Sequence, residues 1–241
     1  MTIASNLIEI RERMDRAARR AGRDPSEVAL MAVSKNHPAA AIVEAVAAGQ
    51  TLFGENRVQE FADKRDEVVR ASRDGKFHLI GHLQSNKAAR AAELFDAVDS
   101  VDSVKLAERL NEAAARLNRT LDVLIEVNVG GEEAKAGVDP ASDELLSLLG
   151  SQGKLTHLAI RGLMTVPPYT EDPEGARECF RQLRELRDRL SASSGLALRE
   201  LSMGMSHDFE VAIEEGSTCV RVGTAIFGAR SYPAPYEEPI R

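Results

Sequence analysis

The sequence is poor in the residues and motifs that mark several large classes of protein. Its 241 residues include no tryptophan and only two cysteines, Cys179 and Cys219. Two widely spaced cysteines form neither a disulfide framework nor a zinc cluster, and both lie within apolar patterns typical of a core. The sequence also lacks a G-x-x-x-x-G-K-[ST] loop, a G-x-G-x-x-G motif and a G-x-S-x-G elbow. The nucleotide, dinucleotide and serine hydrolase sites built on those motifs are therefore not expected.

Long apolar runs and an excess of positive charge are missing as well. No run approaches the roughly 18 apolar residues of a membrane-spanning helix, and the N-terminal segment is typical of an amphipathic helix rather than a signal peptide. The formal net charge is −7, from 31 basic and 38 acidic residues. Because nucleic-acid binding needs a basic face, we expect no nucleic-acid partner. The lack of a membrane-spanning run and of a signal peptide predicts no membrane contact and a cytoplasmic location.

What the sequence does contain is a repeated alternation of strand and helix. Apolar residues three or four positions apart, from Ile3 to Ala21, predict an opening helix that ends at Gly22. Short aliphatic runs then alternate with stretches rich in Ala, Glu, Arg and Leu. Each gap between these runs, except the last, holds a plausible helix, and the clearest covers residues 174–191. The eight predicted strands cover approximately residues 28–34, 51–54, 78–81, 97–101, 122–129, 158–166, 198–203 and 219–222.

The predicted strands do not alternate between apolar and polar residues. Such strands are buried on both faces, as in a parallel sheet that is covered by helices. Eight consecutive strand–helix units predict an α/β fold, a TIM-type (β/α)8 barrel with an extra N-terminal helix, and we expect residues 1–241 to form a single domain. An open doubly wound sheet is the alternative that the pattern leaves open.

Polar residues gather where the predicted strands end. In a β/α barrel these positions meet at the C-terminal mouth, where the active sites of such folds lie. Lys35 is notable among them because it follows the apolar run of residues 28–33. A lysine on a buried strand has a costly charge unless it is paired or neutral, and a neutral amine can attack a carbonyl group. The alternative is that Lys35 only ends the strand and extends its amine to solvent.

Small residues follow the seventh and eighth strands, where many barrels bind a phosphate group. Gly204 and Ser206 lie after the seventh strand, and Gly223 and Thr224 follow the eighth. Small residues let backbone N–H groups approach a phosphate, and the two hydroxyl groups add donors. Each residue taken alone is also consistent with an ordinary turn or, for Ser206 and Asp208, a helix N-cap. Their coincidence at both expected loops favours phosphate binding.

Arg221 lies inside the eighth strand, between two valines, and needs a partner there. One interpretation is a buried ion pair with a carboxylate such as Glu126. The other is that Arg221 faces the pyridine nitrogen of pyridoxal 5′-phosphate (PLP), where PLP enzymes place Asp or Arg. Metal binding is not expected, because His78 and His82 on one strand would lie about 13 Å apart, too far to share an ion.

Seven segments of the sequence resemble those of a known family. They are AVSKNHP (32–38), FGENRVQE (53–60), FHLIGHLQSNK (77–87), EVNVGGEEAKAGV (126–138), RGLMTVPP (161–168), LSMGMSHDFEVAI (201–213) and RVGTAIFGAR (221–230). In the same order and over nearly the whole chain, they resemble the PLP homeostasis proteins, also called proline synthase co-transcribed homologs. The fold of that family is similar to the N-terminal barrel of bacterial alanine racemase.

The resemblance implies a cofactor site at the positions that match the family's motifs. Lys35 would hold PLP as a Schiff base, and Arg221 would face the pyridine nitrogen. The phosphate would be held by Ser206, Gly223 and Thr224, and the pocket would be lined by Asn56, His82 and Met164. Lys135 would be either a secondary PLP contact or an exposed loop lysine. One departure is Asn36-His37, where many relatives have Thr-Lys, so a second lysine near Lys35 is missing.

The resemblance further implies a monomeric carrier that buffers or delivers PLP, with effects on amino-acid and keto-acid balance and transient contacts with PLP-requiring apoenzymes. The alternative is a PLP-dependent amino-acid racemase. Such enzymes need a second domain, and in alanine racemase a tyrosine base from a partner subunit. Here the barrel takes up about residues 28–230, and Tyr169, Tyr232 and Tyr236 fall on no catalytic motif. We therefore expect a binding protein without catalytic residues rather than an enzyme.

Overall fold

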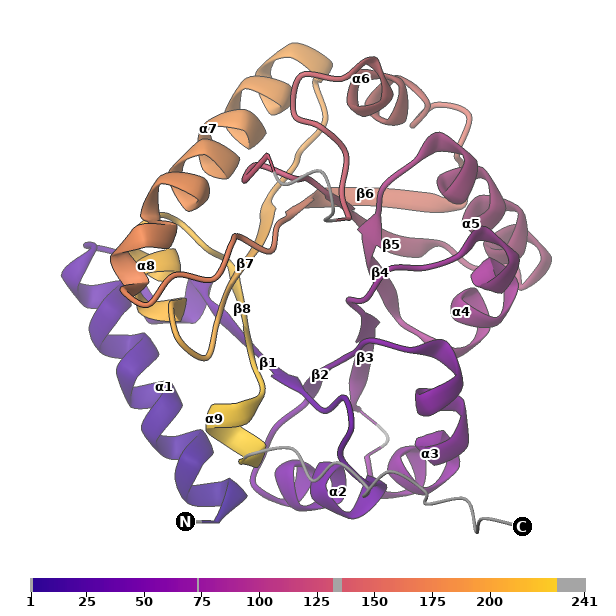
Figure 1. Cartoon of the computed structure of the whole chain (residues 1–241). Helices are drawn as coiled ribbons and strands as arrows, with labels where there is room; N and C mark the ends of the chain where they lie inside the picture. Colours follow the sequence, from indigo (N-terminus) through magenta and orange to yellow (C-terminus); the bar gives the residue numbers. More distant parts are fainter. Residues whose placement is uncertain (1, 73, 132–135, 229–241) are drawn as a thin grey trace, which may run out of the picture.

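The computed structural model describes residues 2–72, 74–131 and 136–228, which contain a closed barrel of parallel strands (Figure 1). The strands pair in chain order, and β8 closes on β1 through four residue pairs, from Ala29 with Cys219 to Ala32 with Val222. This closure confirms the predicted (β/α)8 barrel and excludes the open doubly wound sheet. The strands are β1 (Ala29–Val33), β2 (Leu52–Glu55), β3 (Lys76–Leu79), β4 (Ala97–Val101), β5 (Leu121–Glu126), β6 (Leu158–Met164), β7 (Glu200–Met205) and β8 (Cys219–Val222).

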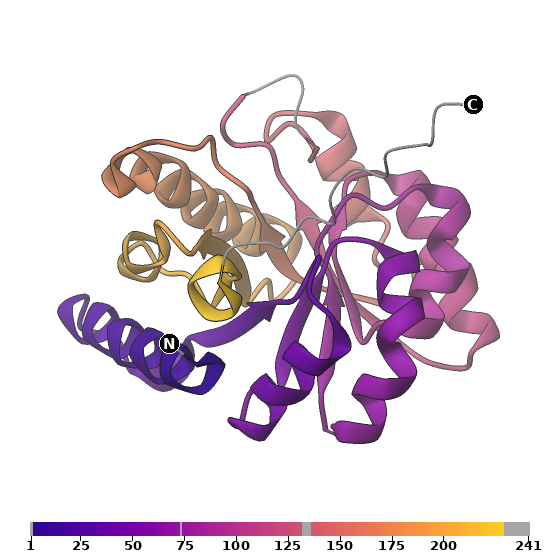
Figure 2. The same ribbon diagram turned by 60° about the horizontal axis from the view of Figure 1, so that its bottom comes forward.

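Helices surround the barrel, as both ribbon views show (Figures 1 and 2). They are α1 (Ile3–Arg20), α2 (Ala39–Ala47), α3 (Val58–Ala71), α4 (Ala88–Leu94), α5 (Val104–Arg116), α6 (Asp143–Gly150), α7 (Arg177–Ser194), α8 (Phe209–Glu214) and α9 (Thr224–Phe227). The predicted N-terminal helix is α1, which packs against α8 and α9 on the outside of the barrel. The apolar face predicted for α7 is also observed, with Phe180, Leu183, Leu186 and Leu190 buried.

Several predicted boundaries differ from the observed ones for local reasons. Strand β5 ends at Glu126, earlier than predicted, because Val127 leaves the strand and forms an isolated bridge with Val138. Strand β7 runs two residues further than predicted, and Gly204, with φ of 95°, lies at the register shift between Ser202 and Met205. A Cβ atom on Gly204 would lie 2.5 Å from the Cβ of Ala212 on α8. The gap before β8, for which no helix was expected, holds the short α8.

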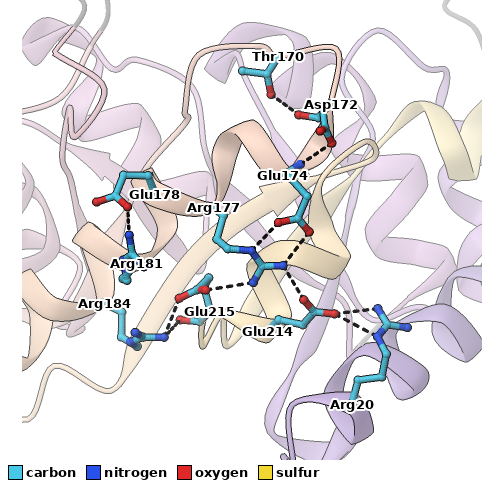
Figure 3. Close-up of polar contacts among 10 residues, drawn as sticks. All are labelled: Arg20, Thr170, Asp172, Glu174, Arg177, Glu178, Arg181, Arg184, Glu214 and Glu215. Carbon is cyan, nitrogen blue, oxygen red and sulfur yellow. Dashed lines mark hydrogen bonds and ion pairs between the residues drawn. The ribbon is translucent and has the colours of Figure 1, made fainter.

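A network of ion pairs connects α1 and α7 to the C-terminal end of α8 (Figure 3). Arg177 on α7 lies 2.8 Å from Glu214 and 3.0 Å from Glu215. Arg20 on α1 contacts the other carboxylate oxygen of Glu214 at 2.9 Å, and Arg184 contacts Glu215 at 2.9 Å. Single partly exposed ion pairs contribute little to stability, but a network fixes geometry. Here it holds α8, which begins directly after the loop that follows β7.

Two findings concern membranes and metals. Within the described ranges no helix is long and apolar enough to cross a bilayer. Among the same residues, no group of three or more His, Cys, Asp or Glu side chains is placed to hold a metal ion. The two histidines considered as ligands have separate partners: His78 lies 3.1 Å from Asp99, and His82 lies 3.2 Å from Asp102.

Candidate functional site: a cavity at the barrel mouth

A cavity of about 620 Å³ opens where the strands end, a volume typical of sites for small molecules. Its lining includes Lys35, Asn56, His82, Ser206, Arg221, Gly223 and Thr224. The structure thus brings together every predicted site residue except Met164. Met164 is fully buried at the end of β6 and lies outside the lining. Lys135, considered as a secondary contact, falls outside the described residues, as do Tyr232 and Tyr236.

Lys35 lies directly after β1, where the backbone turns sharply. The lysine is half-buried, and its neighbour Asn36 has φ of 61°, a left-handed conformation that Asn tolerates better than most residues. On the other side, Ser34 is fully buried, and its N–H donates to the carbonyl of Gly54 at 3.0 Å. The turn therefore places Lys35 in the cavity wall while the residue before it stays in the barrel.

Arg221 reaches the cavity from inside β8 and is only 4 % exposed. Its Nη1 donates to the hydroxyl of Ser202 at 2.7 Å, and its Nη2 donates to the carbonyl oxygen of Thr165 at 2.7 Å. Burial lowers the pKa of Arg221, although a guanidinium keeps its proton in proteins. Among the described residues no ion pair joins Arg221 to Glu126, so the buried pair considered from the sequence is not formed. The guanidinium is instead fixed by neutral acceptors on β7 and directly after β6.

Glu126, at the end of β5, is a second buried group in the cavity wall. It is 7 % exposed, and its Oε2 atom is buried without a hydrogen-bond partner. Burial raises the pKa of Glu126 to about 7, although the nearby charge of Arg221 acts in the opposite direction. The sequence suggested Glu126 only as a partner for Arg221. In the structure it is a carboxyl group that can carry a proton near neutral pH and that faces the same cavity.

The two loops expected to bind phosphate lie in direct contact. The N–H of Gly223 donates to Ser206 Oγ at 3.2 Å, which joins the loop after β7 to the loop after β8. Asp208 occupies the N-cap position of α8, as considered from the sequence, but its side chain makes no capping bond to that helix. It accepts a hydrogen bond from the N–H of Met205 at 2.6 Å and so shapes the first loop. Ser206, Gly223 and Thr224 of the joined loops all line the cavity.

The remaining wall of the cavity contains aliphatic residues together with further polar groups. The Oδ1 atom of Asn56 is buried and has no hydrogen-bond partner, so it can accept one from a ligand. Tyr169 also lines the cavity, is 77 % exposed, and packs its ring 5.5 Å from that of His207. Tyr169 falls on no catalytic motif of the sequence and was not among the predicted site residues. Its position shortly after the sixth strand was the available signal, since residues after strand ends reach the barrel mouth.

The barrel that carries this cavity is of the class found in the N-terminal domain of alanine racemase. The family model for the alanine racemase N-terminal domain matches residues 5–231. An alanine racemase from Clostridium difficile superposes with a TM-score of 0.72 at 15 % identity, over 97 % of this chain and 61 % of the racemase, which shows the shared fold alone.

More similar relatives define the family within that class. A pyridoxal phosphate homeostasis protein of Aquifex aeolicus is 45 % identical over 232 residues, which cover 96 % of this chain and 100 % of the relative. The structure of PipY from Synechococcus elongatus, solved with PLP bound, superposes with a TM-score of 0.82 at 44 % identity, over 94 % of this chain and 100 % of PipY. This chain belongs to the pyridoxal phosphate homeostasis protein family, as its motifs indicated.

Proposed function

We propose that this chain binds PLP in the barrel cavity and serves PLP homeostasis by buffering or delivering the cofactor. One observation carries the proposal: an amine, a buried guanidinium and two joined small-residue loops line one cavity of about 620 Å³. PLP offers an aldehyde, a ring nitrogen and a phosphate, which are the complementary groups. The PLP bound in the structure of PipY supports the same assignment.

In this proposal each described group has a definite role. Lys35 forms a Schiff base with the aldehyde, and Arg221 donates to the pyridine nitrogen. Because a guanidinium cannot accept the ring proton, the nitrogen stays neutral and the ring is a weak electron sink. That electronic state suits storage of the cofactor better than carbanion chemistry. The phosphate is held by Ser206, Gly223 and Thr224, and the ring is flanked by Asn56 and His82.

The spectrum of the PLP-loaded protein tests the covalent attachment. Wild type should show the visible absorbance of a Schiff base, Lys35→Ala should lose it, and Lys154→Ala, which alters an exposed lysine, should keep it. Borohydride reduction followed by peptide mapping should locate the adduct on Lys35. An adduct on another lysine, or a visible band that survives in Lys35→Ala, would overturn the assignment.

We further propose that the protein acts as a carrier without catalysis, as a cytoplasmic monomer that passes PLP to apoenzymes. The homeostasis names of its relatives support this role. The racemase alternative has one observation in its favour, the tyrosine in the cavity wall, Tyr169. An assay of alanine enantiomer interconversion distinguishes the two functions. Turnover that copurifies with wild type and is lost in Tyr169→Phe would replace the carrier by a racemase, whereas wild type without turnover supports the carrier.

A further inference from the structure

A buried charged cluster lies behind the turn that carries Lys35. It consists of Glu55 at the end of β2 and of Glu60 and Lys64, one turn apart on α3, and is called the Lys64 cluster below. The Nζ atom of Lys64 lies 2.8 Å from Glu55 and 3.1 Å from Glu60. The side chain of Lys64 is 10 % exposed and that of Glu55 is fully buried. None of the three residues lines the cavity.

The cluster is hydrogen-bonded to the chain on both sides of Lys35. Lys64 Nζ donates to the carbonyl oxygens of Ser34 at 3.0 Å and His37 at 3.3 Å. Glu60 accepts the N–H of Asn36 at 2.5 Å. Glu55 accepts the hydroxyl of Ser34 at 2.5 Å. Residues 34, 36 and 37 are therefore all hydrogen-bonded to the Lys64 cluster, and Lys35 lies between residues 34 and 36.

The conformation of the turn explains why such attachment matters. Asn36 has φ of 61°, a left-handed conformation that Asn adopts more readily than other non-glycine residues but still at some cost in strain, so contacts with neighbouring residues help to hold it. Past Asn36, the ring of His37 packs 5.0 Å from that of Phe227 on α9. Since α9 begins at Thr224, the turn is held between the Lys64 cluster and the proposed phosphate loop.

Burial of the Lys64 cluster is an energetically unfavourable way to stabilise a fold. Removing charges from water is costly, and well-packed apolar residues of similar volume often stabilise a protein as well or better than a buried ion pair. Burial raises the pKa of Glu55 even though Lys64 opposes the shift, which shows the cost of that burial. The hydrogen bonds to the backbone around Lys35 are what an apolar replacement could not supply.

We propose that Lys64 is a positioning residue that holds the Lys35 turn in the geometry needed for covalent capture of an aldehyde in the cavity. This inference rests on the proposed function, in which that aldehyde is PLP. In the capture step the neutral Lys35 amine forms a bond to the aldehyde carbon. The carbonyl oxygen then leaves as water with two hydrogens from the amine, and a C=N bond replaces C=O. The rate of such a step depends on holding the reacting atoms at about 3–3.5 Å in the correct orientation.

A comparison of two ligands distinguishes a loss of Lys35 positioning from a general disruption of the binding site. PLP forms the Schiff base, whereas pyridoxine 5′-phosphate has an alcohol in place of the aldehyde and binds only non-covalently. We expect Lys64→Met to slow Schiff-base formation, followed by stopped-flow absorbance, by about tenfold or more. Its affinity for pyridoxine 5′-phosphate, measured by calorimetry, should stay within about twofold of wild type. Lys105→Met, on the exposed side of α5, is the matched control and should change neither quantity.

A second pair of variants keeps the test valid if Lys64→Met does not fold. Glu60 is partly exposed, so its replacement is less disruptive. Glu60→Gln keeps an oxygen that can accept the N–H of Asn36 and should form the Schiff base at close to the wild-type rate, whereas Glu60→Met should be slow. Wild-type rates in the folded Lys64→Met and Glu60→Met variants, or parallel losses for both ligands, would overturn the positioning role. Failure of the proposed function looks different, because wild type itself would then form no Schiff base on Lys35.

Discussion

Arg221 on β8 and Ser202 on β7 are joined inside the barrel by a hydrogen bond of 2.7 Å from Nη1 to Oγ. A second bond, from Nη2 to the carbonyl oxygen of Thr165, reaches the end of β6. The guanidinium therefore connects three consecutive strands, and its orientation is set before any ligand enters. Pre-organised donors of this kind bind a ligand without the cost of ordering a flexible side chain.

Replacement of Arg221 should weaken both the fold and the binding of PLP. Arg221→Leu removes the proposed partner of the ring nitrogen and leaves Ser202 and Thr165 without their donor. Hydrogen bonds to charged groups contribute about 1.5–3 kcal/mol, so PLP affinity should fall about 10- to 150-fold. Calorimetry with PLP and denaturant unfolding measure the two effects. Arg161→Leu, which breaks only an exposed pair with Asp122, should leave both nearly unchanged, and unaltered PLP affinity in Arg221→Leu would refute the proposed contact.

The contact between the two loops predicts a phosphate-specific effect at Ser206. Ser206→Ala removes a hydroxyl donor and also the acceptor for the N–H of Gly223. We expect PLP affinity to fall by about 1–2 kcal/mol, or about 5- to 30-fold. Affinity for pyridoxal, which has no phosphate, should not change, and neither affinity should change in Ser193→Ala on the outer helix α7. Equal losses for PLP and pyridoxal would place the phosphate elsewhere.

The raised pKa of Glu126 predicts how the stability of the ligand-free protein depends on pH. Its pKa is about 7 in the folded state against an ordinary value of 4.5 for a glutamate, so between these pH values the folded state holds a proton that the unfolded state has released. Stability is therefore lost as pH rises from about 4.5 to 7, by about 3 kcal/mol in total. Glu126→Gln cannot lose a proton and should be more stable than wild type at pH 8 by up to about that amount, with little difference at pH 4.5.

Unfolding by urea at the two pH values measures this difference. Glu108→Gln, on the exposed side of α5, provides the matched control and should show the same small change at both. A Glu126→Gln variant whose advantage does not grow between pH 4.5 and pH 8 would show that the carboxyl titrates normally in the folded protein.

The barrel and most of its cavity could be predicted because both depend on local patterns. Eight buried strands separated by helices specify the fold, and residues after strand ends reach the mouth, which placed Lys35, Ser206 and Gly223 correctly in one cavity. Met164 shows the limit of this rule. Adjacent residues of a strand point in opposite directions, so the residue that faces the cavity depends on exact strand register and ends.

Other features depend on contacts between distant segments and could not be derived from local patterns. Glu60 and Lys64 have the spacing of a helical ion pair, but their bonds to residues 34, 36 and 37 require the packing of α3 against the end of β1. The position of Tyr169 depends on the path of a loop. Helix α8 has six residues, too few to show a helical period.

The pairing of β1 with β8 has a consequence for the order of events during protein synthesis. Met31, four residues before the lysine, lies opposite Arg221, so the amine and the guanidinium belong to neighbouring strands from opposite ends of the chain. A ribosome releases Lys35 long before it releases Gly223 and Thr224. The complete lining of the cavity, with its proposed PLP contacts, exists only after the last strand has closed the barrel. In the proposed function a nascent chain therefore lacks part of the PLP site, and a ligand that binds only the closed barrel favours completed folding by mass action.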